Sequence, residues 1–458
     1  MKLKQLNYDI VVLGAGPGGF PAALAAARMG KKVLVVEKNG YIGGNAVSGL
    51  PFLGFLDRHG RQVVGGIAQE LIDDLLVLNA SYPHARCPLH NSVTVVDPQI
   101  LRLVMTNKLL EAGVDILLHS QVIEVQCENR QIRRVITAGK GDRALIEASC
   151  FVDATGDGDA AYLAGCSFEK GMEGNGVMQP PTLMFSLCNF DAERFYEYLD
   201  AHPEDLIPSD TINVAEDIAA YNSAFFRANP SHVFLGLRST LAKLQEQGLN
   251  PLKRDTLIYI NTPRPGEIYI NSTRVPRFDG SDSFDLTRGE LESLEQITAL
   301  VSVLRENIPG FENAYINVIN PAIGVRESRR FAGRSRLTID HVLNGHIPED
   351  TVALGAYKVD IHSGTGDGTL LQELDGPYGI PLGCMISADL ENLLLSGRCI
   401  SMDAKALGSM RIMPTCMAIG HGVGVCAALA VEKNLPLSQV DPLEVAGVLK
   451  KGGAILSV

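Results

Sequence analysis

The stretch VVLGAGPGGFPAA, residues 11–23, places a break rich in glycine and proline between an apolar run and an alanine-rich run. The residues before the break, YDIVVLG, are rich in β-branched side chains, which is typical of a buried parallel strand. The residues after it, PAALAAARMG, favour a helix with proline in its first turn, where a missing N–H has little effect. KKVLVVE, residues 31–37, then predicts a second buried strand. The sequence therefore predicts a β-α-β unit with a glycine-rich turn.

The glycines of this turn follow the spacing G-x-G-x-x-G, and Glu37 closes the second strand. We expect Gly14 to form the tight turn, Gly16 to let a pyrophosphate approach the backbone, and Gly19 to let the helix pack closely on the strand. The positive end of the helix faces the phosphates. A carboxylate at Glu37 accepts hydrogen bonds from a ribose and disfavours a 2′-phosphate, which argues against NADP. The unit predicts a dinucleotide site, and leaves FAD and NAD open.

Composition excludes several classes of protein. The 458 residues include 46% hydrophobic and 20% charged residues, an ordinary globular composition that can fill two or three domains. The net charge of −12 argues against nucleic acid and anionic membranes as partners, because these need clustered Lys and Arg.

The most apolar long segment is IMPTCMAIGHGVGVCAALAV, residues 412–431. Its length is that of a membrane span, but His421 and the nearby glycines favour a buried core helix, so we expect no membrane span. No apolar signal region precedes the first strand. The nine cysteines form no C-x-x-C pair, which indicates reduced thiols, neither zinc site nor redox pair, and a cytoplasmic location.

The chain divides into three parts along its length. Residues 1–170 carry the β-α-β unit, a helix over 97–113, and strands that form a β-meander and lead into a parallel strand. From residue 171 the pattern changes to strands, a hairpin around Pro265 and Gly266, and a long amphipathic helix over 288–308. We therefore predict an inserted α+β substrate domain over 171–325, with 326–458 returning to the first domain.

Three further segments carry a resemblance to a known family. They are the Gly43–Gly44 pair with Asn45, the strand and turn CFVDATGDGD at 150–159, and the strand-helix unit at 392–430. Together with GVRESRRFAG at 324–333 and DIH at 360–362, they resemble the FAD-dependent oxidoreductases of the two-domain class related to glutathione reductase. The resemblance implies an α/β fold with a Rossmann-like FAD-binding domain, and a resident, non-covalent FAD. No second nicotinamide-binding unit is evident, since GTGDGT at 364–369 lacks a strand-turn-helix context.

The motifs and the resemblance together name a set of FAD-binding candidates. Asp403 enters this set only by resemblance, as a contact to the ribityl chain. The helix that begins near Met413 is expected to direct its positive end at the flavin. The set is Gly14, Gly16, Pro17, Gly18, Gly19, Glu37, Lys38, Gly43, Gly44, Asn45, Val122, Ala154, Thr155, Gly156, Gly397, Arg398, Asp403, Met413 and Thr415.

The catalytic candidates are His362, Arg326 and Arg411. His362, in a glycine-rich segment expected to be a flexible loop, is the candidate base, because histidine titrates near neutral pH. Arg326 could hold a substrate carboxylate or stabilise the reduced ring, although GVRESRR could instead be a helix N-terminus with salt bridges. Arg411 precedes the helix that faces the flavin. We expect these residues to meet the loop after Gly44 beside the flavin ring.

The leading hypothesis is a two-electron FAD-dependent dehydrogenase or reductase with a small-molecule substrate and an external electron acceptor or donor. Two alternatives remain: a flavoprotein of tRNA modification, and an NAD-binding enzyme of the thiazole-forming type. His84, Cys87 and His90 lie close together in the sequence, but without a further cluster we expect no metal site. A homo-oligomer is compatible with the sequence.

Overall fold

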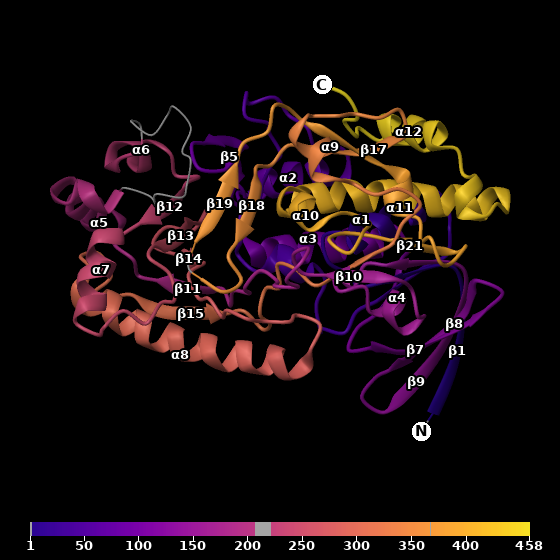
Figure 1. Ribbon diagram of the computed structural model, residues 1–458, viewed down its shortest axis with the longest axis horizontal. Helices are drawn as coiled ribbons and strands as arrows, with labels where there is room; N and C mark the ends of the chain where they lie inside the picture. The colour runs from indigo at the N-terminus through magenta and orange to yellow at the C-terminus, as the bar shows by residue number, and fades with distance from the viewer. Residues whose placement is uncertain (1, 207–220, 367) are drawn as a thin grey trace.

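The largest sheet of the protein is built around the predicted β-α-β unit. The computed structural model describes residues 2–206, 221–366 and 368–458. The sheet runs in the order β6-β2-β1-β9-β8-β7, with β21 also paired to β9, and β6, β2, β1, β9 and β21 are parallel. Figure 1 shows β1, β7, β8 and β9 together at its lower right. Strands β7, β8 and β9 form the predicted antiparallel meander. The bounds are β1 Lys2–Leu13, β2 Val33–Val36, β6 Asp115–Leu117, β7 Gln121–Glu128, β8 Gln131–Ala138, β9 Asp142–Asp153 and β21 Leu393–Leu395.

Two helices packed on this sheet approach each other closely. A Cβ added at Gly420 would lie 2.2 Å from the carbonyl oxygen of Gly18, and one at Gly424 would lie 2.3 Å from that of Ala22. Glycines on α11 therefore allow the backbones of α1 and α11 to touch, which fixes α11 against the glycine-rich turn. The helices of this half are α1 Gly19–Arg28, α2 Ile67–Val77, α3 Pro98–Glu111, α4 Asp159–Leu163, α11 Met413–Lys433 and α12 Pro442–Lys451. The helix predicted over 97–113 is α3, and the Asp97 carboxylate caps it by accepting from the N–H groups of Gln99 and Ile100.

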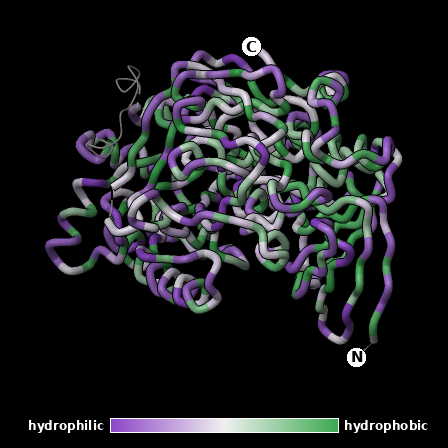
Figure 2. The backbone as a smooth tube through the Cα atoms, turned by 45° about the vertical axis from the view of Figure 1, so that its right-hand side comes forward, coloured by the Kyte–Doolittle hydropathy of each residue, from purple (hydrophilic) through white to green (hydrophobic). Residues whose placement is uncertain are grey.

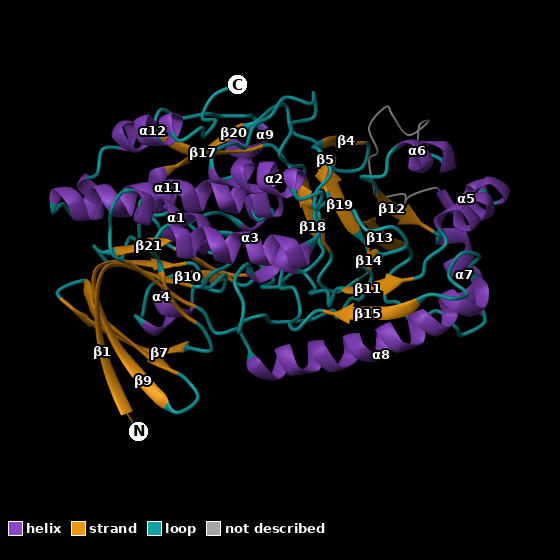
Figure 3. Ribbon diagram, turned by 180° about the vertical axis from the view of Figure 1, so that it is seen from behind, coloured by secondary structure: helices purple, strands orange, loops and turns teal. Residues whose placement is uncertain are grey.

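A second sheet of five strands runs in the order β12-β13-β14-β11-β15 and is antiparallel. The predicted hairpin is confirmed as β13 and β14, and the predicted long helix is α8, which lies along β11 and β15 (Figure 3). The bounds are β11 Phe185–Cys188, β12 Val233–Gly236, β13 Leu257–Asn261, β14 Ile268–Ile270, β15 Tyr315–Ile319, α5 Ala192–Ala201, η2 Pro203–Leu206, α6 Ser223–Ala228, α7 Arg238–Glu246 and α8 Ser283–Asn307.

The molecule has two large hydrophobic cores, one for each of these sheets. The second core also takes in Cys87, Leu89, Val93 and Val95, which precede the predicted substrate domain in the chain. Cys87 and Val93 belong to a small sheet, β3-β5-β4, and Leu89 and Val95 lie in the adjoining turn and chain; the bounds are β3 Phe52–Leu53, β4 Ala85–Cys87 and β5 Asn91–Thr94. The mixed α/β fold with a Rossmann-like sheet is therefore confirmed, and the boundaries at 170/171 and 325/326 stay a prediction.

The structure excludes one alternative for local structure and differs from one prediction. GVRESRR does not begin a helix: Arg329–Phe331 forms strand β16, antiparallel to β10 Phe168–Lys170. His362 does not lie in a loop, because it ends strand β18 Val359–His362, which pairs with β19 Thr369–Gln372. In both cases pairing with a distant or neighbouring strand satisfies the backbone N–H and C=O groups, which the local sequence does not reveal. Asp367, in the sequence stretch GTGDGT at 364–369, lies outside the described residues.

The remaining short elements pack mainly around α11 and its neighbours, where β17 contacts both α11 and α12 (Figure 1). Strands β17 and β20 pair with each other, and α10 packs against β18. Their bounds are η1 Gly44–Val47, α9 Ile339–Leu343, β17 Thr351–Gly355, β20 Tyr378–Pro381, η4 Leu382–Cys384, α10 Ala404–Met410 and η5 Leu437–Gln439.

Helix α11 is the predicted apolar helix, and it runs inside the protein. By length and composition α11 is long and apolar enough to cross a membrane. However, 89% of its apolar 18-residue stretch is buried among other elements. Figure 2 shows hydrophobic stretches through the middle of the molecule and hydrophilic residues recurring in the outer loops. The burial of α11 is that of a core helix.

Candidate functional site

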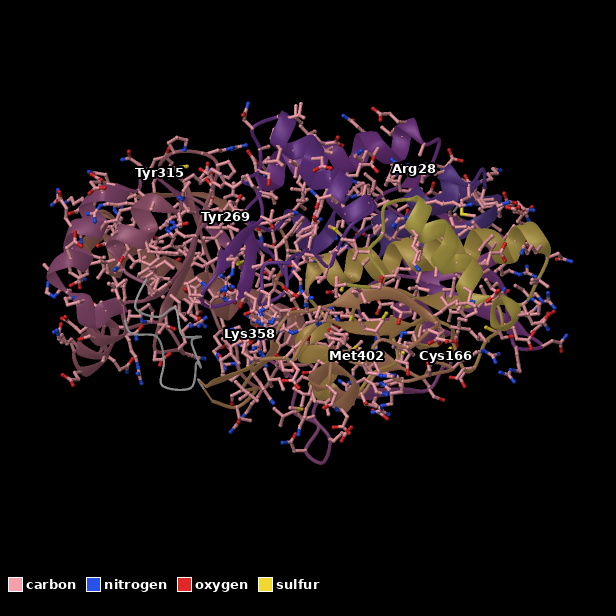
Figure 4. All side chains as sticks on the ribbon, turned by 90° about the horizontal axis from the view of Figure 1, so that it is seen from above. Arg28, Cys166, Tyr269, Tyr315, Lys358 and Met402 are labelled. Atoms are coloured by element: carbon pink, nitrogen blue, oxygen red, sulfur yellow. The ribbon has the colours of Figure 1, made fainter. Side chains whose placement is uncertain are left out.

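A cavity of about 550 Å³ extends from the glycine-rich turn after β1 to the second sheet. Its volume lies in the range of sites for small molecules and cofactors. Loop residues after Gly44 form part of the wall, and a Cβ added at Gly49 would fall 2.1 Å from the ring of Tyr269 on β14. Figure 4 places Tyr269 and Lys358 near the middle of the molecule, between its two halves. The cavity therefore lies where the two halves meet.

The glycine end of the cavity is built from backbone in close contact. Gly14 has φ +97°, and a Cβ there would lie 2.3 Å from the carbonyl oxygen of Ala154. A Cβ at Gly19 would lie 1.9 Å from the carbonyl oxygen of Gly14. Both positions require glycine because neighbouring backbone fills the space, as predicted for the tight turn and the close helix–strand packing.

Gly16 differs from these two glycines, because nothing in the described protein crowds it. The nearest atom to an added Cβ would be the Cα of Gly44 at 3.9 Å, and Gly16 lines the cavity. Protein packing therefore does not account for a glycine here, whereas a ligand against the backbone does. The turn fits a bound pyrophosphate.

Glu37 lies at the end of β2, lines the cavity, and is 6% exposed. Its carboxylate accepts hydrogen bonds from the backbone N–H of Ala15, at 2.9 Å, and of Asn39, at 2.8 Å. Besides its predicted role toward a ribose, Glu37 therefore holds the glycine-rich turn against the end of β2.

The end of β9 forms the neighbouring wall. The buried Asp153 carboxylate accepts hydrogen bonds from the backbone N–H and hydroxyl of Thr155 and from the N–H of Ala161. Burial raises the pKa of Asp153 to about 6, although these hydrogen bonds favour its charged form. Arg398 donates to the Asp157 carboxylate and the Ser328 hydroxyl, both at 2.6 Å, and joins this wall to the GVRES segment.

Most residues predicted to bind FAD line this one cavity, together with the three catalytic candidates. Gly19, Gly43, Asp403 and Thr415 do not line it. Those that do are Gly14, Gly16, Pro17, Gly18, Glu37, Lys38, Gly44, Asn45, Val122, Ala154, Thr155, Gly156, Gly397, Arg398 and Met413, with His362, Arg326 and Arg411.

Asp403 has a structural role away from the cavity. Its carboxylate caps α10 by accepting from the N–H of Ala406, and also accepts from the N–H of Ile339. Gly43 has φ +115° and a Cβ there would strike Val47, so it shapes the turn into η1. Thr415 is buried within the first turn of α11.

One nitrogen of the Arg326 guanidinium, Nη1, is held by hydrogen bonds. It donates to the carbonyl oxygen of Pro180 at 2.6 Å and to Thr182 Oγ1 at 2.8 Å. Burial and the nearby charge of Arg411 lower the pKa of Arg326 to about 9, so it is still a cation at neutral pH.

His362, Asp360 and Arg411 form a buried charged group beside Arg326. The His362 Nε2 lies 3.3 Å from Asp360 Oδ1, and Arg411 Nη2 lies 3.3 Å from Asp360 Oδ2. The His362 Nδ1 lies 3.1 Å from the Thr369 hydroxyl. Burial lowers the pKa of His362 well below its usual value, with Arg326 and Arg411 acting in the same direction against Asp360. His362 is therefore neutral at pH 7, and one of its two ring nitrogens carries a lone pair.

The cavity wall also contains polar and charged residues that were not among the candidates predicted from the sequence. Arg254, Tyr357, Asp360 and His90 all line it. Asp360 lies in the DIH motif, two residues before His362, and that proximity could have drawn attention to it. Arg254 and Tyr357 lie in no recognisable motif. His90 Nδ1 is 3.5 Å from Cys87 Sγ, and among the described residues no group of three His, Cys, Asp or Glu side chains is arranged to hold a metal.

Residues 9–449 of the chain match the family model described as FAD dependent oxidoreductase. The chain belongs to this family. Its cofactor is FAD, and it is an oxidoreductase. The predicted family and cofactor are thus confirmed, and the cavity with its glycine-rich turn is the candidate site for the FAD.

Curated relatives match only parts of the chain. The thiamine thiazole synthase of Aeropyrum pernix is 29% identical over 153 residues, 33% of this chain and 52% of that protein. The dihydrolipoyl dehydrogenase of Corynebacterium glutamicum is 63% identical over 38 residues, 8% of each chain. The chain thus spans about half or less of the length of these two relatives. The FAD family match covers nearly the whole chain, so the thiazole-forming alternative is not the better supported one.

Among solved structures, a geranylgeranyl bacteriochlorophyll reductase-like protein from Thermoplasma acidophilum is 14% identical, with a TM-score of 0.47. The match covers 98% of this chain and 85% of that one.

Proposed function

We propose that the protein transfers two electrons between a small organic substrate and a non-covalently bound FAD, and that an external electron acceptor or donor completes the cycle. The observation that carries the proposal is the cavity itself, which joins the glycine-rich turn at one end to His362, Arg326 and Arg411 at the other. FAD, when bound, supplies the two-electron chemistry at its flavin ring. The residues of the chain then need to orient the substrate and handle its proton.

His362 is the proposed base, and its contacts select one nitrogen. His362 Nε2 lies 3.3 Å from Asp360 Oδ1, and a carboxylate only accepts hydrogen bonds, so we propose the tautomer that carries its hydrogen on Nε2. Nδ1 is then the nitrogen that accepts a proton, next to the Thr369 hydroxyl that also lines the cavity. In substrate oxidation, Nδ1 takes the proton that leaves the substrate as the hydride departs.

Two further features support charge stabilisation at this end. Arg326 and Arg411 place positive charge in the cavity wall, and the first turn of α11 contributes Ile412, Met413 and Cys416 to the same wall. The positive end of a helix and two guanidinium groups stabilise negative charge on a substrate or a reduced flavin ring. We also propose that the protein acts in the cytoplasm, which the nine free cysteines support.

The test begins with the purified protein. We expect a visible flavin spectrum, release of yellow FAD into the supernatant on denaturation, and anaerobic bleaching by a subset of small metabolites. Colour that remains with the precipitated chain would contradict non-covalent binding. A flavin that no small molecule reduces, and that no small molecule reoxidises once it is reduced chemically, would contradict the proposed reaction.

A further inference from the structure

Strands β12 and β13 present an aliphatic wall to the cavity. Val233 lies opposite Ile260 and Leu235 lies opposite Ile258 in the antiparallel register, and all four side chains line the cavity. Residues directly opposite each other project to the same face of a sheet, so the four form one continuous apolar surface. This surface belongs to the second sheet, across the cavity from the glycine-rich turn. Its chemistry suits the hydrocarbon part of a ligand.

Two guanidinium groups adjoin this wall. Arg254 precedes β13, and it donates to the carbonyl oxygen of Asn271 and to Thr256 Oγ1, both at 3.3 Å. Arg254 is therefore anchored on the sheet that carries the aliphatic wall. Neither Arg254 nor Arg326 has a carboxylate within 4 Å among residues 2–206, 221–366 and 368–458.

Arg326 offers a complete edge for an anion. Its Nη1 is occupied by Pro180 and Thr182, whereas its Nη2 and Nε make no hydrogen bond to any described residue. The Nη2–Nε edge of a guanidinium matches the two oxygens of a carboxylate, and fixing Nη1 sets the direction of that edge in advance.

The charges around Arg326 favour an anionic ligand. The guanidinium groups of Arg411, Arg274 and Arg254 each act to lower the pKa of Arg326, and Asp360 is the nearby carboxylate that opposes them. Because Asp360 is paired with Arg411, Arg254 and Arg326 retain an excess of positive charge in the cavity wall. An anion bound between them would relieve this repulsion.

We propose that the substrate is an organic acid with an aliphatic body, whose carboxylate binds Arg326 and Arg254 and whose hydrocarbon part lies against β12 and β13. This inference rests on the proposed function, because it assigns this end of the cavity to the substrate. In this proposal Arg326 and Arg254 recognise the substrate, and His362 carries out the proton transfer.

The test is a calorimetric titration of the FAD-loaded protein with butyrate, hexanoate, octanoate and octanedioate, after the visible spectrum has shown full FAD content. Each buried CH₂ contributes about 0.8 kcal/mol, so we expect the dissociation constant to fall about fourfold per added CH₂. We expect octanedioate to bind more weakly than octanoate, because its second carboxylate would lie against the aliphatic wall.

Two variants and a control locate the binding. Arg326→Gln should weaken all the monocarboxylates at least tenfold. Ile258→Thr should weaken octanoate more than butyrate. The matched control is Ile316→Thr, an isoleucine 38% exposed on β15 of the same sheet, and it should change neither. In all three variants the FAD content should equal that of the natural protein.

Three results would overturn the inference: affinity independent of chain length, tighter binding of octanedioate than of octanoate, or no binding of any acid by protein with full FAD content. None of these results would contradict the proposed two-electron transfer, because each concerns only the kind of substrate that the protein binds. A purified protein that holds no flavin would instead contradict the non-covalent site itself.

Discussion

The two ends of the cavity are built in different ways. The glycine end is made of backbone, where Gly14 and Gly19 approach other main-chain atoms so closely that a Cβ does not fit. The opposite end is made of side chains, where Arg326, Asp360 and His362 come together from separate hydrogen bonds and ion pairs. A backbone site is rigid and general for the cofactor, whereas a side-chain site can change its substrate with few substitutions. Substitutions at the two ends should therefore have separable effects.

The largest effect is expected at the glycine end. Gly14→Ala would place a Cβ 2.3 Å from a carbonyl oxygen at a positive φ, so we expect loss of FAD and a large loss of stability. Gly30→Ala is the matched control, because it shares a positive φ of +77° but has no atom within 4 Å of the added Cβ. It should cost only the backbone strain, about 1–2 kcal/mol. FAD content and melting temperature measure both, and equal losses in the two variants would show that close backbone contact is not what the site requires.

At the side-chain end, His362→Ala should lower turnover by roughly 10²- to 10⁴-fold, the usual contribution of a positioned base. The flavin spectrum should stay intact, because His362 is not part of the glycine end. His346→Ala, at an exposed histidine, is the control. Turnover within threefold of the natural protein would remove His362 from the proposed role.

Glu37→Ala should act on the cofactor and leave the substrate end unchanged. It removes a carboxylate that accepts two backbone N–H groups, and such charged hydrogen bonds contribute about 1.5–3 kcal/mol. We expect FAD affinity to fall about 10- to 100-fold, as measured by FAD retained after dialysis. Glu37→Gln, which keeps one acceptor oxygen, should lose less. Full FAD occupancy after dialysis of Glu37→Ala would argue against any cofactor role.

Arg326→Lys should raise the KM for an anionic substrate about tenfold with little change in kcat. Lysine keeps the positive charge but cannot make a two-point contact with a carboxylate. A lower kcat at an unchanged KM would instead place Arg326 in the chemical step. It would contradict the assignment of Arg326 to substrate recognition alone.

The smallest effect is expected from mild acidification. Between pH 7 and 6, a histidine with an unperturbed pKa of about 6.5 would lose about threefold in its neutral form. The pKa of His362 is lowered, so its neutral form persists to lower pH and is lost only as the pH falls through that lower value. We therefore expect kcat/KM to stay nearly constant over this interval. A threefold fall that is absent in His362→Ala would show that His362 titrates in its usual range.

The sequence named residues that line both ends of the cavity, but it predicted the local geometry only at the glycine end, and the reason is physical. Gly14, Gly16 and Glu37 are neighbours in one β-α-β unit, so their spacing alone carries the geometry. Arg254 reaches the cavity from the second sheet, and no local pattern joins it to Arg326. His362 was predicted in a loop but ends β18, because the pairing of β18 with β19 depends on backbone contacts that the residue types do not specify. Asp403 was assigned by resemblance to a cofactor contact, whereas here it caps α10.

The most direct test of the account is a crystal structure of the protein with FAD bound. We expect the pyrophosphate against Gly16, the ribose at Glu37, and the flavin ring at the end of the cavity lined by Arg326, with His362 beside the flavin N5 across the space for a substrate. A flavin ring far from His362, with no nearby segment able to carry that histidine inward, would contradict the assignment of the two ends.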